Sequence, residues 1–111
     1  MRRFGQVIKL KPEKYEYYKE LHANPWPEVL AKIKECNLQN YNIFHKDGYL
    51  FAYFEYTGDD FEADMAKMMD DPKTQEWWRE TDPCQTPIDE NVTSHYEGEW
   101  WANMEELFFV E

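Results

Sequence analysis

A tyrosine and a histidine four positions apart, followed by a tryptophan between two prolines, are the residues of this chain best suited to chemistry. Tyr18 and His22 share one face if their segment is helical, and the Pro25-Trp26-Pro27 step then opens a second helix. Histidine gives or accepts a proton near neutral pH, and an aromatic neighbour can orient a substrate or exclude water. The pattern predicts a small acid/base site at His22, bordered by Tyr18 and Trp26. A histidine buried for structural reasons is the alternative, and for a lone histidine on an apolar stripe it is the commoner case.

Composition and charge exclude several classes of protein. A chain of 111 residues is long enough for one domain with a core, and a single domain over residues 1–111 is expected. Aromatic residues make up 18% of the chain, more than such a core requires, so some should line a pocket or an interface. The net charge is −11 and there is no basic run, which argues against binding to nucleic acid or to an anionic membrane. The expected substrate is small and is neutral or cationic.

The N-terminus and the cysteines indicate a cytoplasmic protein. Residues 1–9 contain no apolar run of signal-peptide length, and no stretch of the sequence approaches a membrane span. Cys36 and Cys84 are isolated from each other and from histidine, so two free thiols in a reducing compartment are expected.

Hydrophobic periodicity predicts an alternation of strands and helices. Strands are expected at residues 4–10, 38–45, 49–56 and 104–110, helices at 12–23, from 27, from 61 and from 72, and a long loop at 82–103. The Asp47-Gly48 step predicts a tight hairpin of type I′. This order is that of an α+β fold, the ferredoxin-like split βαβ topology, with a four-stranded antiparallel sheet and helices on one face.

Two features of the sheet and its helices bear on partners and metals. The second strand presents Tyr41 and Ile43 on one side and Phe44 on the other, so the sheet face without helices needs a cover, most simply a second copy in a two-fold homodimer. The pairs Asp59-Asp60 and Asp70-Asp71 stand at expected helix starts, where capping explains them. Neither a metal nor a cofactor is expected.

Four motifs spread over the chain resemble the L-rhamnose mutarotase family. They are Tyr18-x-x-x-His22, Pro25-Trp26-Pro27-Glu28, Asn40-Tyr41-x-Ile43 and Trp77-Trp78. The resemblance extends along the whole chain, in the same order, as far as residues 106–110. The chain departs from the family pattern in a longer, more aromatic loop at 95–103, which bears on which sugar is bound. The resemblance implies a ferredoxin-like domain that dimerises into an α+β barrel and interconverts the α and β anomers of a 6-deoxyhexose.

The resemblance also implies roles for the site residues. His22 is expected to be the proton donor, and Tyr18, Tyr41 and the pair Trp77-Trp78 are expected to contact a small neutral monosaccharide, with Trp26 in the same site. Mutarotation needs only a positioned acid and base. The partner base is left open among Tyr18, a carboxylate and an ordered water.

Other histidines and other functions have to be weighed against this interpretation. His45 is expected to be exposed, and His95 is expected either to be exposed or to close the pocket. Adjacent tryptophans on a helix point about 100° apart, so one of Trp77 and Trp78 should lie in the core. The alternative functions are a small monooxygenase or haem-handling protein on the same barrel, and a sugar-binding module without catalysis.

Overall fold

The computed structural model describes residues 1–111. Its strands are β1 (Arg2–Leu10), β2 (Leu38–Lys46), β3 (Tyr49–Tyr56), β4 (Gln85–Thr86) and β5 (Ala102–Met104). Its helices are α1 (Tyr15–Ala23), α2 (Pro27–Glu35), α3 (Phe61–Asp70) and α4 (Pro72–Thr81), with short 3₁₀ turns at Pro12–Lys14 and Asp82–Cys84. None of the helices is long and apolar enough to cross a membrane.

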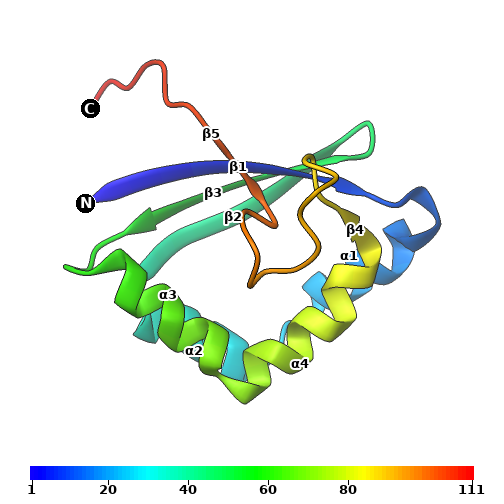
Figure 1. Ribbon diagram of the computed structural model, residues 1–111, viewed down its shortest axis with the longest axis horizontal. Helices are drawn as coiled ribbons and strands as arrows, with labels where there is room; N and C mark the ends of the chain where they lie inside the picture. Colours follow the sequence, from blue (N-terminus) through cyan, green and yellow to red (C-terminus); the bar gives the residue numbers. More distant parts are fainter.

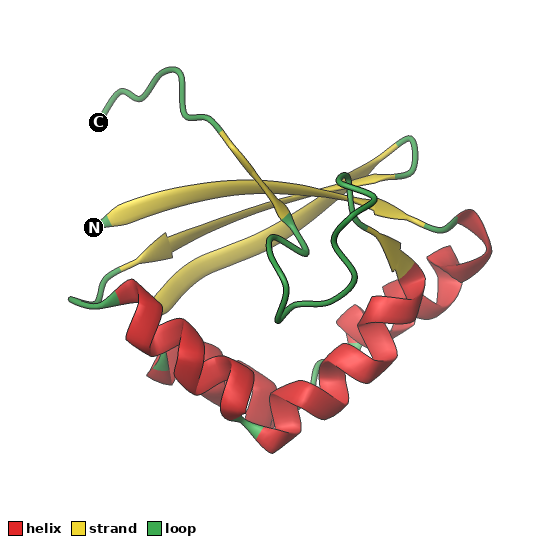
Figure 2. Cartoon of the chain, viewed as in Figure 1, coloured by secondary structure: helices red, strands yellow, loops and turns green.

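A curved antiparallel sheet lies against the four helices, which cover one of its faces (Figures 1 and 2). The strands stand in the order β2-β3-β1-β4, and β5 also pairs with β1. This is the order of the ferredoxin-like split βαβ fold, so the predicted fold class is confirmed.

The fourth strand was expected at residues 104–110, and this expectation is wrong. Its place beside β1 is shared by two short strands, β4 opposite Lys9–Leu10 and β5 opposite Gly5–Val7. The register that pairs Gly5 with Met104 leaves only Arg2–Phe4 of β1 for residues 105–107, and residues 108–110 lie beyond the start of β1. Residues 105–111 therefore form no strand and run past the end of the sheet, close to the N-terminus (Figure 1).

The loops and caps follow the sequence closely. Asp47 and Gly48 both have positive φ, 51° and 81°, as a type I′ hairpin requires. Asp60 accepts a hydrogen bond from the Ala63 amide at 3.1 Å, and Asp71 accepts one from the Thr74 amide at 2.9 Å. Both acidic pairs therefore supply helix N-caps, as predicted.

A bulge in β2 determines which of its side chains face the helices. The register against β3 shifts between Gln39 and Asn42, and Asn40 adopts a left-handed φ of 51°. The Tyr41 ring lies on the inner, helix-covered face of the sheet, where it stacks on Phe54 at 5.3 Å, and the shift returns the buried Leu38 to this same face. Ile43 shares this face, and Phe44 points to the other, as predicted.

A buried carboxylate, Asp64 on α3, connects this helix to the C-terminal end of β3 through hydrogen bonds. Asp64 accepts hydrogen bonds from the Tyr56 hydroxyl at 2.5 Å and the Asn37 amide at 3.0 Å, and it forms an ion pair with Lys67 at 3.0 Å. These partners, Tyr56 foremost, lower the pKa of Asp64 from 3.8 to about 2.

The variant Asp64→Asn should be less stable than the parent at neutral pH and should lose less stability in acid. A carboxyl whose pKa is lower in the folded state stabilises the fold above its unfolded pKa and loses this effect as pH falls to its folded pKa. For Asp64 the window runs from about pH 4 down to about pH 2. Urea unfolding across this range tests the prediction, with the exposed Asp59→Asn as the control. Equal pH slopes for parent and Asp64→Asn would contradict it.

Candidate active site

His22 lies in the last turn of α1, one helical turn after Tyr18, so the two side chains share a face. Their ring centroids are 4.2 Å apart, and His22 Nδ1 lies 2.8 Å from the backbone oxygen of Tyr18. Because a carbonyl only accepts hydrogen bonds, Nδ1 carries the proton in neutral imidazole. Nε2 is then the nitrogen that can accept a proton from a ligand.

Two tryptophans from other helices complete an aromatic group around His22. Trp77, on α4 and only 9% exposed, meets the His22 ring edge-on at 5.3 Å. Trp26, the N-cap of α2, meets Trp77 edge-on at 5.2 Å. Four of the predicted site residues therefore come together from three helices.

Burial sets the protonation of these groups. Desolvation lowers the pKa of His22 below 6.5, against the opposing effect of its bond to the Tyr18 carbonyl. Desolvation raises the pKa of the Tyr18 hydroxyl well above its ordinary value, and the nearby Tyr41 hydroxyl raises it further. Burial of the Tyr41 hydroxyl raises its own pKa to about 12. At neutral pH both phenols are therefore un-ionised, and neutral imidazole is favoured at His22.

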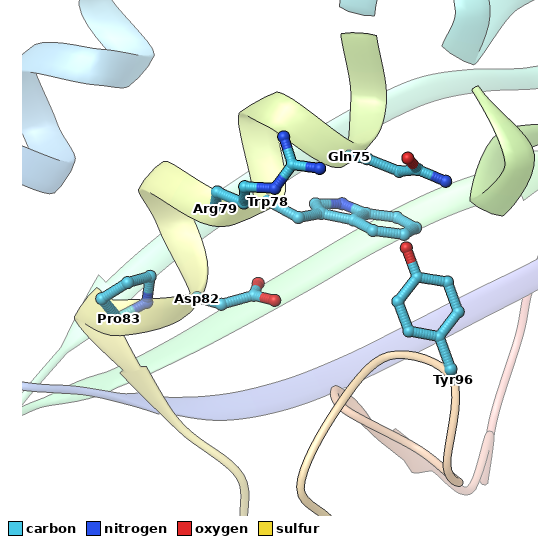
Figure 3. A pocket seen from close by; sticks show the side chains of 6 residues that line it. All are labelled: Gln75, Trp78, Arg79, Asp82, Pro83 and Tyr96. Carbon is cyan, nitrogen blue, oxygen red and sulfur yellow. The ribbon is translucent and has the colours of Figure 1, made fainter. Parts of the chain in front are cut away.

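Trp78 faces a different environment from Trp77. Its ring stacks on His95 at 3.9 Å with an interplanar angle of 4°. Trp78 also lines an open cavity of about 620 Å³, together with Gln75, Arg79, Asp82, Pro83 and Tyr96 (Figure 3). His22 does not line this cavity, so Trp77 belongs to the His22 group and Trp78 to the neighbouring one. As expected for adjacent tryptophans on a helix, one of the two, Trp77, lies in the core.

The family model described as L-rhamnose mutarotase matches residues 3–110 of the chain. The chain belongs to the L-rhamnose mutarotase family. It is 34% identical over 85 residues to the L-rhamnose mutarotase of Bacillus subtilis, which covers 75% of this chain and 79% of that protein. It is 30% identical over 113 residues to the L-rhamnose mutarotase of Shouchella clausii, with 99% of each chain covered.

Solved structures show the same fold at lower identity. The L-rhamnose mutarotase of Formosa agariphila superposes with a TM-score of 0.76 at 23% identity, with all of both chains covered. The tetracenomycin F2 cyclase of Streptomyces glaucescens, a polyketide cyclase, superposes with a TM-score of 0.72 at 14% identity, covering 100% of this chain and 98% of that one. The fold is thus found in proteins outside the mutarotase family, and it cannot identify the activity by itself.

Gln85 was not singled out from the sequence, whereas His95 and the aromatic loop that contains Trp100 were. Gln85 begins β4, and His95 and Trp100 lie in the loop between β4 and β5. His95 is not exposed as a loop residue would be: its side chain is 14% exposed, and its Nε2 lies 2.8 Å from Asp82. Only the unusual aromatic content of residues 95–103 hinted at this packing. No local signal marked Gln85.

Proposed function

We propose that this member of the family is a mutarotase that interconverts the α and β anomers of L-rhamnose or a related 6-deoxyhexose. The observation that carries the proposal is the grouping of Tyr18, His22 and Trp77, with His22 Nε2 left free of protein partners, in a chain of this family. Trp77 and Trp26 provide apolar ring faces for the C–H side of a sugar and for a methyl group. Tyr41 and Trp78 are proposed as further sugar contacts.

In the proposed reaction His22 Nε2 takes the proton of the anomeric hydroxyl and delivers it to the ring oxygen. The O–H bond at the anomeric carbon and the bond from that carbon to the ring oxygen break, while a carbonyl and a new hydroxyl form. The aldehyde group then rotates. In the reverse steps the new hydroxyl oxygen attacks the other face of the carbonyl carbon, which closes the ring as the other anomer. No proton is consumed overall, so one histidine can serve in both directions.

The raised pKa of Tyr18 favours one role for its hydroxyl. A phenol that stays un-ionised at neutral pH is a poor base and a dependable hydrogen-bond donor. We therefore assign Tyr18 to hydrogen bonding with the sugar and place the proton transfers on His22.

The alternatives are less well supported. A monooxygenase or haem-handling protein could share this fold, as the polyketide cyclase does, but the relatives matched over most of the chain are L-rhamnose mutarotases. A sugar-binding module without catalysis would not require the lowered pKa and free Nε2 of His22.

Anomer exchange followed by saturation-transfer NMR tests the proposal directly. We expect the protein to accelerate exchange of L-rhamnose, then of L-mannose, and of L-fucose least. A methyl group in an aromatic pocket is worth only about 1–3 kcal/mol, so the related sugars should react more slowly without being rejected. A preference for L-fucose would retain the reaction and change the substrate, while no acceleration of any sugar would refute the proposal.

The rate should depend on pH through His22. Because the neutral imidazole accepts the anomeric proton and its pKa lies below 6.5, kcat/KM should rise with pH through a midpoint below 6.5 and be level near neutrality. Exchange without protein, measured at each pH, is the control. A rate that falls as pH rises toward 7 would mean that the cationic form is the active one.

We also infer a homodimer in the cytoplasm. The sheet face without helices carries exposed apolar side chains, among them Phe44 (68%), Phe51 (37%) and Met104 (42%), and a second copy would cover them. Cys36 and Cys84 are both free and buried, which fits a reducing compartment.

A further inference from the structure

Gln85 is a buried polar residue between the loop after β4 and the Tyr18 hydroxyl. Its exposed fraction is 4%, and both ends of its side-chain amide are hydrogen-bonded. Trp100 Nε1 donates to Gln85 Oε1 at 2.9 Å, and Gln85 Nε2 donates to the Tyr18 hydroxyl oxygen at 3.0 Å.

The orientation of this amide is fixed by chemistry. An indole N–H can only donate, so the amide end facing Trp100 must be the carbonyl oxygen. The NH₂ end then faces Tyr18 and can only donate. The Tyr18 oxygen is therefore an acceptor toward the protein, and its own hydrogen bonds to no other protein group.

We propose that Gln85, held by Trp100, is a positioning residue that directs the Tyr18 hydroxyl to donate its hydrogen bond to the sugar. This inference rests on the proposed function. A donor held at the oxygen on which charge develops during ring opening stabilises the transition state more than the ground state. Trp100 belongs to the aromatic loop at residues 95–103, so the loop acts on the site through Gln85.

The variant Gln85→Glu reverses the hydrogen bond to Tyr18. One oxygen of an ionised carboxylate can still accept from Trp100, but the other can only accept from Tyr18, whose proton is then turned away from the sugar. Removal of a preorganised donor typically lowers kcat about 10²–10³-fold, and we expect a loss in this range, seen in kcat more than in KM. A protonated carboxyl can donate as the amide does, so the deficit should shrink as pH falls.

The variant Gln85→Met separates positioning from packing. Methionine fills a similar volume without either hydrogen bond, so Tyr18 is released but not reversed, and the rate should fall less than in Gln85→Glu. A purely structural role would instead give losses that follow the melting temperatures of the two variants.

A double-mutant cycle with Tyr18→Phe gives the decisive measurement. Without the hydroxyl there is no proton to direct, so Gln85→Glu in the Tyr18→Phe background should change the exchange rate of L-rhamnose by no more than about 2-fold, the usual scatter of independent sites. An equal loss in both backgrounds, or a fully active Gln85→Glu, would overturn the inference. If Gln85→Glu does not fold, the same cycle with Gln85→Met is used, with the same criterion.

Parent protein and His22→Ala are measured in the same experiment. No exchange by the parent would overturn the proposed function and this inference with it. An active parent that depends on His22 but not on Gln85 would overturn the inference alone.

Discussion

The variant His22→Ala should fold normally and lose most of its rate of L-rhamnose anomer exchange. General acid–base catalysis contributes on the order of 10²–10⁴-fold, and in the proposed reaction both proton transfers pass through His22 Nε2. The fold should survive because His22 is only partly buried and the one hydrogen bond of its side chain is to the Tyr18 carbonyl of its own helix. Saturation-transfer NMR with and without each variant measures the loss.

The matched control for this substitution is His45→Ala. His45 is an exposed histidine on β2, as the sequence predicted, and it accepts a hydrogen bond only from the Gly48 amide at 3.3 Å. We expect it to retain the parent rate. An His22→Ala protein as fast as the parent would remove His22 from the catalytic role and leave it a structural histidine.

The second large effect is expected on dimerisation, when the exposed phenylalanines of the sheet are replaced by aspartate. The parent should scatter light as a particle of twice the 13.6 kDa chain mass, and the double variant Phe44→Asp, Phe51→Asp should scatter as a monomer. Each phenylalanine buried at an interface contributes roughly 1.5–3 kcal/mol, and a carboxylate placed there lacks a partner. Both side chains lie on the sheet face without helices and are exposed in the single chain.

Leu30→Asp provides the control for the assembly experiment. Leu30 is another exposed apolar residue (45%), but it lies on α2, on the helical side of the molecule, so the charge should leave the dimer unchanged. A parent protein that is monomeric at micromolar concentration would refute the dimer, and dissociation by Leu30→Asp would move the interface to the helices.

Much of the fold could be predicted because local signals determine it. Pro27 and Pro72 open helices, Asp60 and Asp71 cap them, and Asp47-Gly48 closes the hairpin, each through the conformation of a few neighbouring residues. The expected strand at 104–110 was wrong because strand formation also needs a partner edge, and residues 108–110 lie beyond the start of β1, which a local pattern cannot report.

The site was predictable only in part for a similar reason. Tyr18 and His22 are neighbours through helical spacing, which the sequence shows directly. Trp77 joins them from a helix about fifty residues later in the chain, and only the family resemblance placed it there. Gln85 and His95 are polar residues of a segment expected to be a loop, and their burial depends on tertiary contacts. The aromatic residues around His95 were the one indication of such contacts, and Gln85 had none.

The bulge at Asn40 lets side chains on both of its sides in β2 face the helices, although an odd number of positions separates them, where a regular alternation needs an even number. The hairpin fixes the pairing of the later residues, so that odd-numbered ones such as Ile43 face the helices, while the core requires the even-numbered Leu38, which is 4% exposed. In an unbroken strand, side chains alternate strictly, and one of these requirements would fail. Removing the single extra residue Asn40 would therefore leave a regular strand in which Leu38, Tyr41 and Ile43 all still face the helices, whereas removing two residues would turn one end of β2 outward. The inward position of Leu38 is thus specified by the number of residues in the strand as much as by their types.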